Sequence, residues 1–189
     1  RLLEEGGRFH AAGTTAARPA MLLTVLGAGI LCMGLASLLF PQGAYQRPQI
    51  AADLRDKAEK SQVSLTVEGQ DVQAEGVRRL LHETIYNLCD NAIGYNVPGG
   101  SVRVTVTDRG DSAAISVADT GIGIAPEHQS RVFERFYRVD KSHSKASGGT
   151  GLGLSIVKHA VAYHHGTLEL ESQPGKGTTI TVTIPKKKT

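Results

Sequence analysis

The sequence predicts an α+β fold, a two-layer sandwich in which helices cover one face of a mixed β-sheet. Alternating apolar residues occur in two hairpin-like pairs of segments, and stretches with helical spacing lie before and between these pairs instead of following every strand. The chain of 189 residues is long enough for one such core with a short appendage. We therefore expect a single domain of this class.

Composition excludes several classes of function. A net charge of +3 is too small to predict a nucleic-acid-binding surface. The hydrophobic content of 40% is typical of a folded chain. Cys32 and Cys89 lie in unlike segments without a short spacing, so neither a disulfide framework nor a cysteine metal site is predicted.

The N-terminal part of the chain contains one long apolar segment. Residues 1–20 follow no sustained period, and we predict no structure for them. Residues 21–40, MLLTVLGAGILCMGLASLLF, carry no charge and are long enough to cross a bilayer as a helix. The alternative is a buried helix of a soluble core, which would usually keep a polar stripe, whereas only Thr24 and Ser37 interrupt this segment.

The rest of the chain divides into a linker, a domain and a tail. Two prolines and a glycine predict a linker over residues 41–48, the domain is expected over residues 49–185, and residues 186–189 form a basic tail. Hydrophobic spacing then predicts the elements of the domain. The predicted helices cover residues 51–60, 76–95 and 152–163. The predicted strands cover or centre on residues 63–67, 72–74, 102–106, 115–117, 168–170 and 180–184.

Asn87 and Asn91 form the first candidate site. They lie four residues apart on the predicted helix 76–95, on a different stripe from the buried apolar residues, so their amides point the same way. Amide oxygens can bind a hard cation such as magnesium, which takes waters and phosphates as its other ligands. The alternative is a pair of ordinary surface asparagines.

Asp119 begins the second candidate site, a D-x-G-x-G pattern at the end of a predicted strand. Gly121 and Gly123 allow a flat ligand to approach the backbone closely, and the carboxylate can accept a hydrogen bond from an exocyclic amine such as that of adenine. The pattern by itself is also that of a common turn.

The third candidate site is a glycine-rich loop that leads into the predicted helix 152–163. Such a loop offers backbone N–H groups and the positive end of the helix dipole to phosphates. The spacing differs from that of P-loops and dinucleotide-binding loops, and a flexible hinge is the alternative. The residues of this site are Gly149, Thr150, Gly151, Leu152 and Gly153.

The order of these motifs, together with the segment FERFYR at residues 133–138, resembles the catalytic ATP-binding domain of sensor histidine kinases over about residues 48–185. The resemblance implies that ATP and magnesium are bound. It assigns magnesium to Asn87, phosphate contacts to Asn87 and Asn91, and the adenine amine to Asp119, beside Gly121 and Gly123. The glycine-rich loop then becomes the hinge of an ATP lid formed by residues 138–148.

The resemblance also implies the kind of reaction. Gyrase-like relatives carry a water-activating glutamate at the position of Asn87, and an amide cannot act as a base. ATP is therefore expected to serve phosphoryl transfer to a histidine, with Asn87, Arg138 and Lys141 as the catalytic candidates. Arg135 and Lys145 are further cationic candidates, and for each of these cations a solvated charged loop is the alternative.

Two departures from the family pattern bear on function. Where the family often has a lysine, this chain has Gly94, so weaker phosphate binding is expected. No histidine lies in a His-Glu-x-x-x-Pro-like box, so no phosphoacceptor is expected in the chain. The expected partners are a histidine-bearing dimerisation domain or an intact kinase in trans, and a response regulator. The expected location is the cell membrane, with the ATP-binding domain in the cytoplasm.

Two other functions remain open at this point. A non-catalytic nucleotide-binding regulatory module is favoured by the missing acceptor histidine. A serine kinase of the anti-sigma type would share the fold without a histidine hairpin, but the segment at residues 133–138 argues against it.

Overall fold

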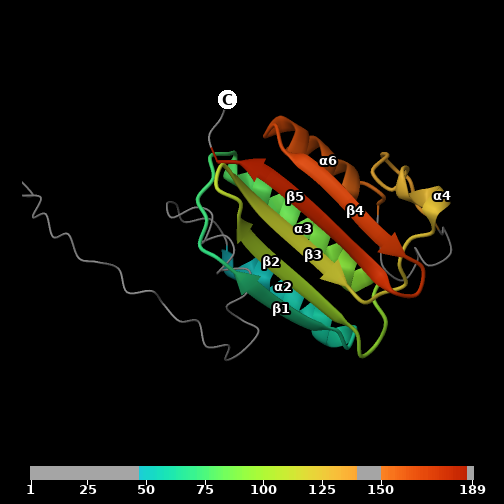
Figure 1. The fold of residues 1–189 in the computed structure, drawn as a ribbon. Coiled ribbons are helices and arrows are strands. Elements are labelled where there is room, and N and C mark those ends of the chain that lie inside the picture. The colour runs from blue at the N-terminus through green and yellow to red at the C-terminus, as the bar shows by residue number, and fades with distance from the viewer. Residues whose placement is uncertain (1–46, 140–149, 187–189) are drawn as a thin grey trace, which may run out of the picture.

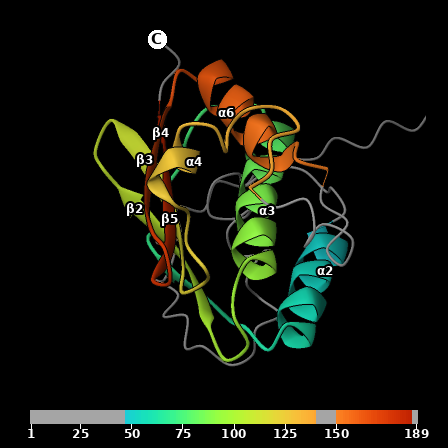
Figure 2. The ribbon, with the colours of Figure 1, turned by 90° about the vertical axis from the view of Figure 1, so that its right-hand side faces the viewer.

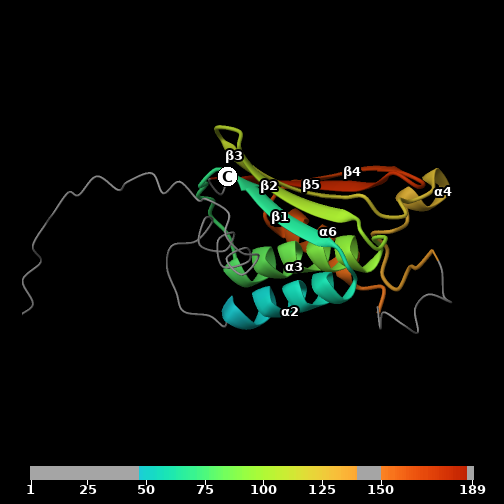
Figure 3. The same ribbon diagram turned by 90° about the horizontal axis from the view of Figure 1, so that it is seen from below.

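A computed structural model describes residues 47–139 and 150–186. They form one β-sheet with helices α2, α3 and α6 packed on a single face (Figures 1 and 3). This arrangement confirms the predicted α+β sandwich. The apolar segment at residues 21–40 lies outside the described residues, and no helix within them is both long and apolar enough to cross a membrane.

The sheet is mixed, as predicted. Its strand order is β1-β2-β3-β5-β4, with β1 parallel to β2 and all other neighbours antiparallel. Both predicted hairpins are present, as β2–β3 and β4–β5. The strands are β1 (Ser64–Gly69), β2 (Ser101–Asp108), β3 (Ser112–Asp119), β4 (Thr167–Gln173) and β5 (Gly177–Pro185).

The helices follow the predicted order with shifted ends. Helix α2 begins earlier than predicted, inside the expected linker, and a short helix after β3 was not predicted. Pro126 starts this short helix, a position that suits the fixed backbone of proline. The helices are α2 (Arg47–Lys60), α3 (Arg78–Gly94), α4 (Pro126–Gln129) and α6 (Gly153–Tyr163).

The predicted strand at residues 72–74 is wrong. After β1 ends at Gly69, the chain crosses from the sheet towards α3 without forming a ladder. Val72 is only 1% exposed because it packs into the hydrophobic core. Ala74 is half-buried and packs against the same core, so the apolar alternation that predicted a strand here reflects packing of a connecting segment.

The core lies between the inner face of the sheet and the helices. Val102, Val104 and Val106 alternate along β2 and are almost fully buried, as expected for one face of a strand. Leu88 and Ile93 of α3 belong to the same apolar cluster. Helix α3 is therefore held against the sheet by its apolar stripe, which leaves its other stripes for polar residues.

Helix α3 lies between α2 and α6 (Figure 2). Polar contacts join it to both neighbouring helices. The Lys57 ammonium of α2 lies 2.5 Å from Asp90 Oδ1 of α3. His164, next to the end of α6, accepts a hydrogen bond from the Val77 N–H through Nε2 at 2.9 Å. Its Nδ1 donates to the Ala160 carbonyl at 2.6 Å. These contacts fix α3 between α2 and α6.

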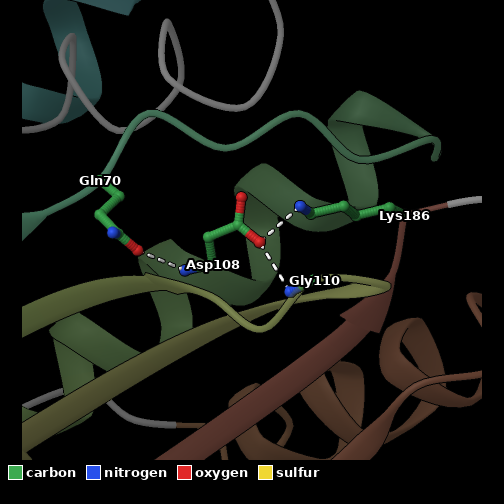
Figure 4. Close-up of polar contacts among 4 residues, drawn as sticks. All are labelled: Gln70, Asp108, Gly110 and Lys186. Atoms are coloured by element: carbon green, nitrogen blue, oxygen red, sulfur yellow. Dashed lines mark hydrogen bonds and ion pairs between the residues drawn. The ribbon is translucent and has the colours of Figure 1, made fainter.

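The turn between β2 and β3 is tied to the end of β5 (Figure 4). Asp108 Oδ1 accepts hydrogen bonds from Lys186 Nζ at 2.5 Å and from the Gly110 N–H at 2.8 Å. These two bonds lower the pKa of Asp108 below its usual value, the Lys186 bond most strongly. Gln70 accepts a hydrogen bond from the Asp108 N–H at 2.8 Å. This end of the sheet is opposite the end at which Asp119 lies.

Candidate functional site

The amide of Asn87 has a defined orientation on α3. Its Nδ2 donates a hydrogen bond to the Glu83 carbonyl at 2.7 Å, so Oδ1 must point the other way. A Cβ added to Gly153 would lie 2.9 Å from Asn87 Oδ1 and 3.5 Å from Asn91 Nδ2. The structure thus brings both asparagines next to the first residue of α6, and a side chain at Gly153 would press on Asn87.

No side-chain cap among the described residues covers the start of α6 beside these asparagines. Leu152 is the N-cap residue and makes no side-chain capping hydrogen bond. Just before it, Gly151 has a φ of 69°, and its carbonyl accepts a hydrogen bond from the Phe136 N–H at 2.8 Å. The C-terminal part of the glycine-rich loop is therefore hydrogen-bonded to the FERFYR segment.

Asp119 ends β3 with one oxygen held by the backbone. Oδ1 accepts hydrogen bonds from the Gly121 N–H at 2.8 Å and the Thr178 N–H at 3.1 Å. Both hydrogen bonds that the described residues give to this carboxylate go to Oδ1. Burial raises the pKa of Asp119 above its usual value, although the two backbone hydrogen bonds act in the opposite direction. The carboxylate is half-buried, fixed and left with a second oxygen to accept a hydrogen bond.

The loop after Asp119 packs against the C-terminal end of α3. The Ile122 N–H donates to the Tyr95 carbonyl at 3.1 Å, and Gly121 lies against the backbone of Tyr95 and Asn96. Gly123 adopts a φ of 68°, and a Cβ added there would lie 2.1 Å from the Gln173 carbonyl oxygen, so only glycine fits this position. From Asn87 to Tyr95, α3 rises by about 12 Å, so Asn87 and the Asp119 loop lie about two helical turns apart along the same helix.

Several predicted site residues lie in the segment 140–149, which the structure does not describe, or next to it. Gly149, Lys141 and Lys145 lie in this segment. Thr150 is exposed and Arg138 is half-buried. The Arg135 guanidinium lies 5.8 Å from the centre of the Phe136 ring. The described part of the chain contains no cluster of His, Cys, Asp and Glu residues that could hold a metal ion.

Thr178 is a site residue that the sequence analysis missed. Its N–H fixes Asp119 because β5 runs antiparallel to β3, which brings the first residues of β5 opposite the last residue of β3. Gly177 just before it lies against the Asp119 backbone. The sequence did predict the C-terminal hairpin, whose turn at residues 173–177 comes just before Thr178. The strand order, which places β5 next to β3, is what brings this turn to Asp119.

Comparison with known proteins gives the family. Residues 76–188 match the family model described as histidine kinase-, DNA gyrase B-, and HSP90-like ATPase. The chain belongs to this ATPase family. The sensor-like histidine kinase SenX3 of Mycolicibacterium smegmatis is 47% identical over 144 residues, which cover 76% of this chain and 36% of SenX3. The phosphate regulon sensor protein PhoR of Pseudomonas aeruginosa is 46% identical over 110 residues, which cover 58% of this chain and 25% of PhoR.

Solved structures give the same branch of the ATPase family. The catalytic domain of the histidine kinase ThkA superimposes with a TM-score of 0.63 at 26% identity, covering 73% of this chain and 88% of that one. The mycobacterial sensor histidine kinase MprB superimposes with a TM-score of 0.61 at 31% identity, covering 74% of this chain and 93% of that one. The chain therefore carries the ATP-binding catalytic domain of sensor histidine kinases, and it spans a quarter to about a third of the length of the curated relatives named above.

Proposed function

We propose that this domain binds ATP with magnesium and transfers the γ-phosphoryl group to a histidine on another domain or chain. The observation that carries the proposal is the placement of three polar features along one helix. Asn87 of α3 lies beside the start of α6, and the Asp119 loop packs against the C-terminal end of α3. This arrangement suits a nucleotide whose base and phosphates contact different turns of the same helix.

Asp119 is proposed to recognise the adenine amine. Its Oδ1 is occupied by two backbone N–H groups, which leaves Oδ2 as the acceptor for a donor on the ligand. A base with a carbonyl in place of the amine would present an acceptor to this carboxylate. The domain is then expected to prefer the base with the amine, because the half-buried Asp119 carboxylate would have no donor from a base with a carbonyl there.

Asn87 and Asn91 are proposed to serve the phosphate end of the nucleotide. Asn87 Oδ1 fits magnesium, because the bond from Nδ2 to Glu83 directs this neutral oxygen away from its own helix turn. Gly151, Leu152 and Gly153 provide a close backbone approach and uncapped N–H groups for the phosphates, with Gly149 and Thr150 before them. Bound magnesium would neutralise charge on the phosphate oxygens.

Transfer is proposed over hydrolysis because the asparagine pair supplies no base. Asn87 is an amide, and the neighbouring carboxylate Glu83 pairs with Arg79 at 3.2 Å. Arg138 and Lys141 are proposed to stabilise charge on the transferred phosphoryl group. The acceptor histidine would belong to a dimerisation domain or to an intact kinase, and a response regulator would receive the phosphoryl group next. A membrane anchor at residues 21–40, with this domain in the cytoplasm, completes the proposal.

One labelling experiment tests the proposal against its alternatives. The chain is incubated with ATP labelled in the γ-phosphate, alone and with a separately purified histidine-hairpin domain. Acid-labile label on the hairpin domain is expected, and Asp119→Asn should reduce it. Acid-stable label on serine would instead identify a serine kinase. ATP binding without any transfer would identify a regulatory module without activity of its own.

A further inference from the structure

The hydroxyl of Ser172 joins three segments next to Asp119. Ser172 is the second-last residue of β4, and the register places it opposite Thr178 of β5. Its Oγ accepts a hydrogen bond from the Ile124 N–H at 2.8 Å. It donates to the Gly177 carbonyl at 3.1 Å and lies 2.8 Å from Thr178 Oγ1. The loop after Asp119 and the start of β5 therefore meet at this one side chain.

These three bonds use the full hydrogen-bonding capacity of the hydroxyl. A serine hydroxyl has one donor and two acceptor lone pairs. Here the donor goes to Gly177, one lone pair accepts the Ile124 N–H, and the other is left for the Thr178 hydroxyl. A fully used hydroxyl has a single low-energy direction, so it fixes its three partners relative to one another.

Gln129 of α4 supports the same junction from the other side. Its Nε2 donates to the carbonyls of Ile124 and Ser172, both at 2.9 Å. The contacts of Ser172 and Gln129 therefore reach both residues whose N–H groups bind Asp119. Gly121 belongs to the loop tied down at Ile124, and the Thr178 N–H belongs to the residue whose hydroxyl contacts Ser172.

We infer that Ser172 is a positioning residue for Asp119 and thereby sets the selectivity of the site for a purine that carries a 6-amino group. Ser172 acts through the Ile124 loop and Thr178 to hold the carboxylate in the direction of the amine. This inference rests on the proposed binding of ATP, since it concerns the base-recognising end of that site.

The test compares ATP with purine riboside triphosphate, which has the same ribose and phosphates but lacks the 6-amino group. Affinities of both are measured by calorimetry for the wild-type chain and for Ser172→Ala. We expect Ser172→Ala to weaken ATP binding about three- to ten-fold, the range of one hydrogen bond, and to leave binding of the amine-free nucleotide unchanged. Ser172→Thr, which keeps the hydroxyl, should retain the wild-type preference for ATP.

Ser116→Ala is the matched control. It removes a serine hydroxyl of β3 that lies 3.1 Å from Thr181 Oγ1 of β5, the two strands that carry Asp119 and Thr178. Among the described residues, Ser116 makes no hydrogen bond to Asp119. It should leave the preference for ATP unchanged. Gln129→Met should shift the preference in the same direction as Ser172→Ala, and it keeps the test available if Ser172→Ala does not fold.

Two outcomes would overturn the inference. One is an equal loss of affinity for both nucleotides in Ser172→Ala, which would mean a general loss of structure. The other is a further loss of ATP preference when Ser172→Ala is added to Asp119→Asn, because a residue that acts only through Asp119 has no effect once Asp119 is replaced. Failure of the proposed function is distinct, since the wild-type chain itself would then bind neither nucleotide.

Discussion

At the scale of single residues, the proposed role of Asp119 in base recognition comes with a cost in stability. Recognition of an amine requires a fixed acceptor that is shielded from water, and this burial raises the pKa of the carboxyl group. The backbone N–H groups of Gly121 and Thr178 offset part of that cost. Affinity for ATP and stability of the empty domain are therefore expected to respond in opposite ways to changes at this residue.

Asp119→Asn should weaken ATP binding by about 1 to 3 kcal/mol. The amide keeps one oxygen for the Gly121 and Thr178 N–H groups, but its NH₂ group then faces the donor on the adenine. Calorimetry with ATP is the measurement. Unchanged affinity in a folded Asp119→Asn chain would contradict the assignment of Asp119 to the base.

The same variant should change how stability depends on pH. Because the pKa of Asp119 is higher in the folded than in the unfolded chain, the folded state holds the proton more tightly. The contribution of Asp119 to stability is therefore fully present below the unfolded pKa and is lost as pH rises through the folded pKa. Urea unfolding of both chains should show the stability of Asp119→Asn, relative to wild type, increasing across this window and staying constant at higher pH. A relative decrease would contradict the raised pKa.

At the scale of elements, α3 contacts each part of the proposed ATP site that the structure describes. Its apolar stripe holds it on the sheet, its asparagines face the start of α6, and its last turn contacts the Asp119 loop. Its last residue is Gly94, where the family often has lysine, and the Lys57 ammonium bound to Asp90 lies beside this position. The helix thus ends on a residue that weakens it.

Gly94→Ala should raise the free energy of unfolding by about 0.5 kcal/mol. Gly94 has no left-handed backbone, and a Cβ there would meet only the Lys57 ammonium end, at 3.4 Å. Gly99→Ala is the matched control, because Gly99 has a φ of 81° and open space around it, so the same substitution there should destabilise the domain. Urea unfolding measures both. A loss of stability in Gly94→Ala would mean that α3 needs the glycine at this position.

At the scale of the whole chain, the sequence context of the histidines bears on the proposed transfer reaction. The 189 residues contain seven histidines, among them His164, which is buried with both ring nitrogens in hydrogen bonds to the backbone. None of the seven lies in a phosphoacceptor sequence box.

The purified chain by itself should take up no acid-labile label from γ-labelled ATP. The physical reason is that phosphoryl transfer needs a nucleophile in line with the γ-phosphate, and no histidine of the chain has the sequence context of an acceptor. Gel autoradiography after acid and alkali treatment is the measurement. Label that appears on the chain and vanishes in His10→Ala would contradict this expectation and identify His10 as the acceptor.

Residues 21–40 should retain the full-length chain in bacterial membranes. An uncharged helix of this length rises about 30 Å, which matches the hydrocarbon core of a bilayer. Carbonate extraction of membranes is the measurement, and deletion of residues 1–44 should release the domain. A full-length chain in the soluble, monodisperse fraction would contradict the predicted span.

Local periodicity and motif order by themselves determined the hairpins, α3, α6 and the family of this domain. The reason is that helix and strand spacing depend on neighbours in the chain, and Asp119 with its glycines forms a local motif. The tertiary structure alone decided that residues 72–74 form no strand, since Val72 is buried in the core instead of pairing. It also decided that Ser172, Thr178 and Gln129 surround the Asp119 loop. Those contacts depend on the strand order β3-β5-β4, which joins segments distant in sequence.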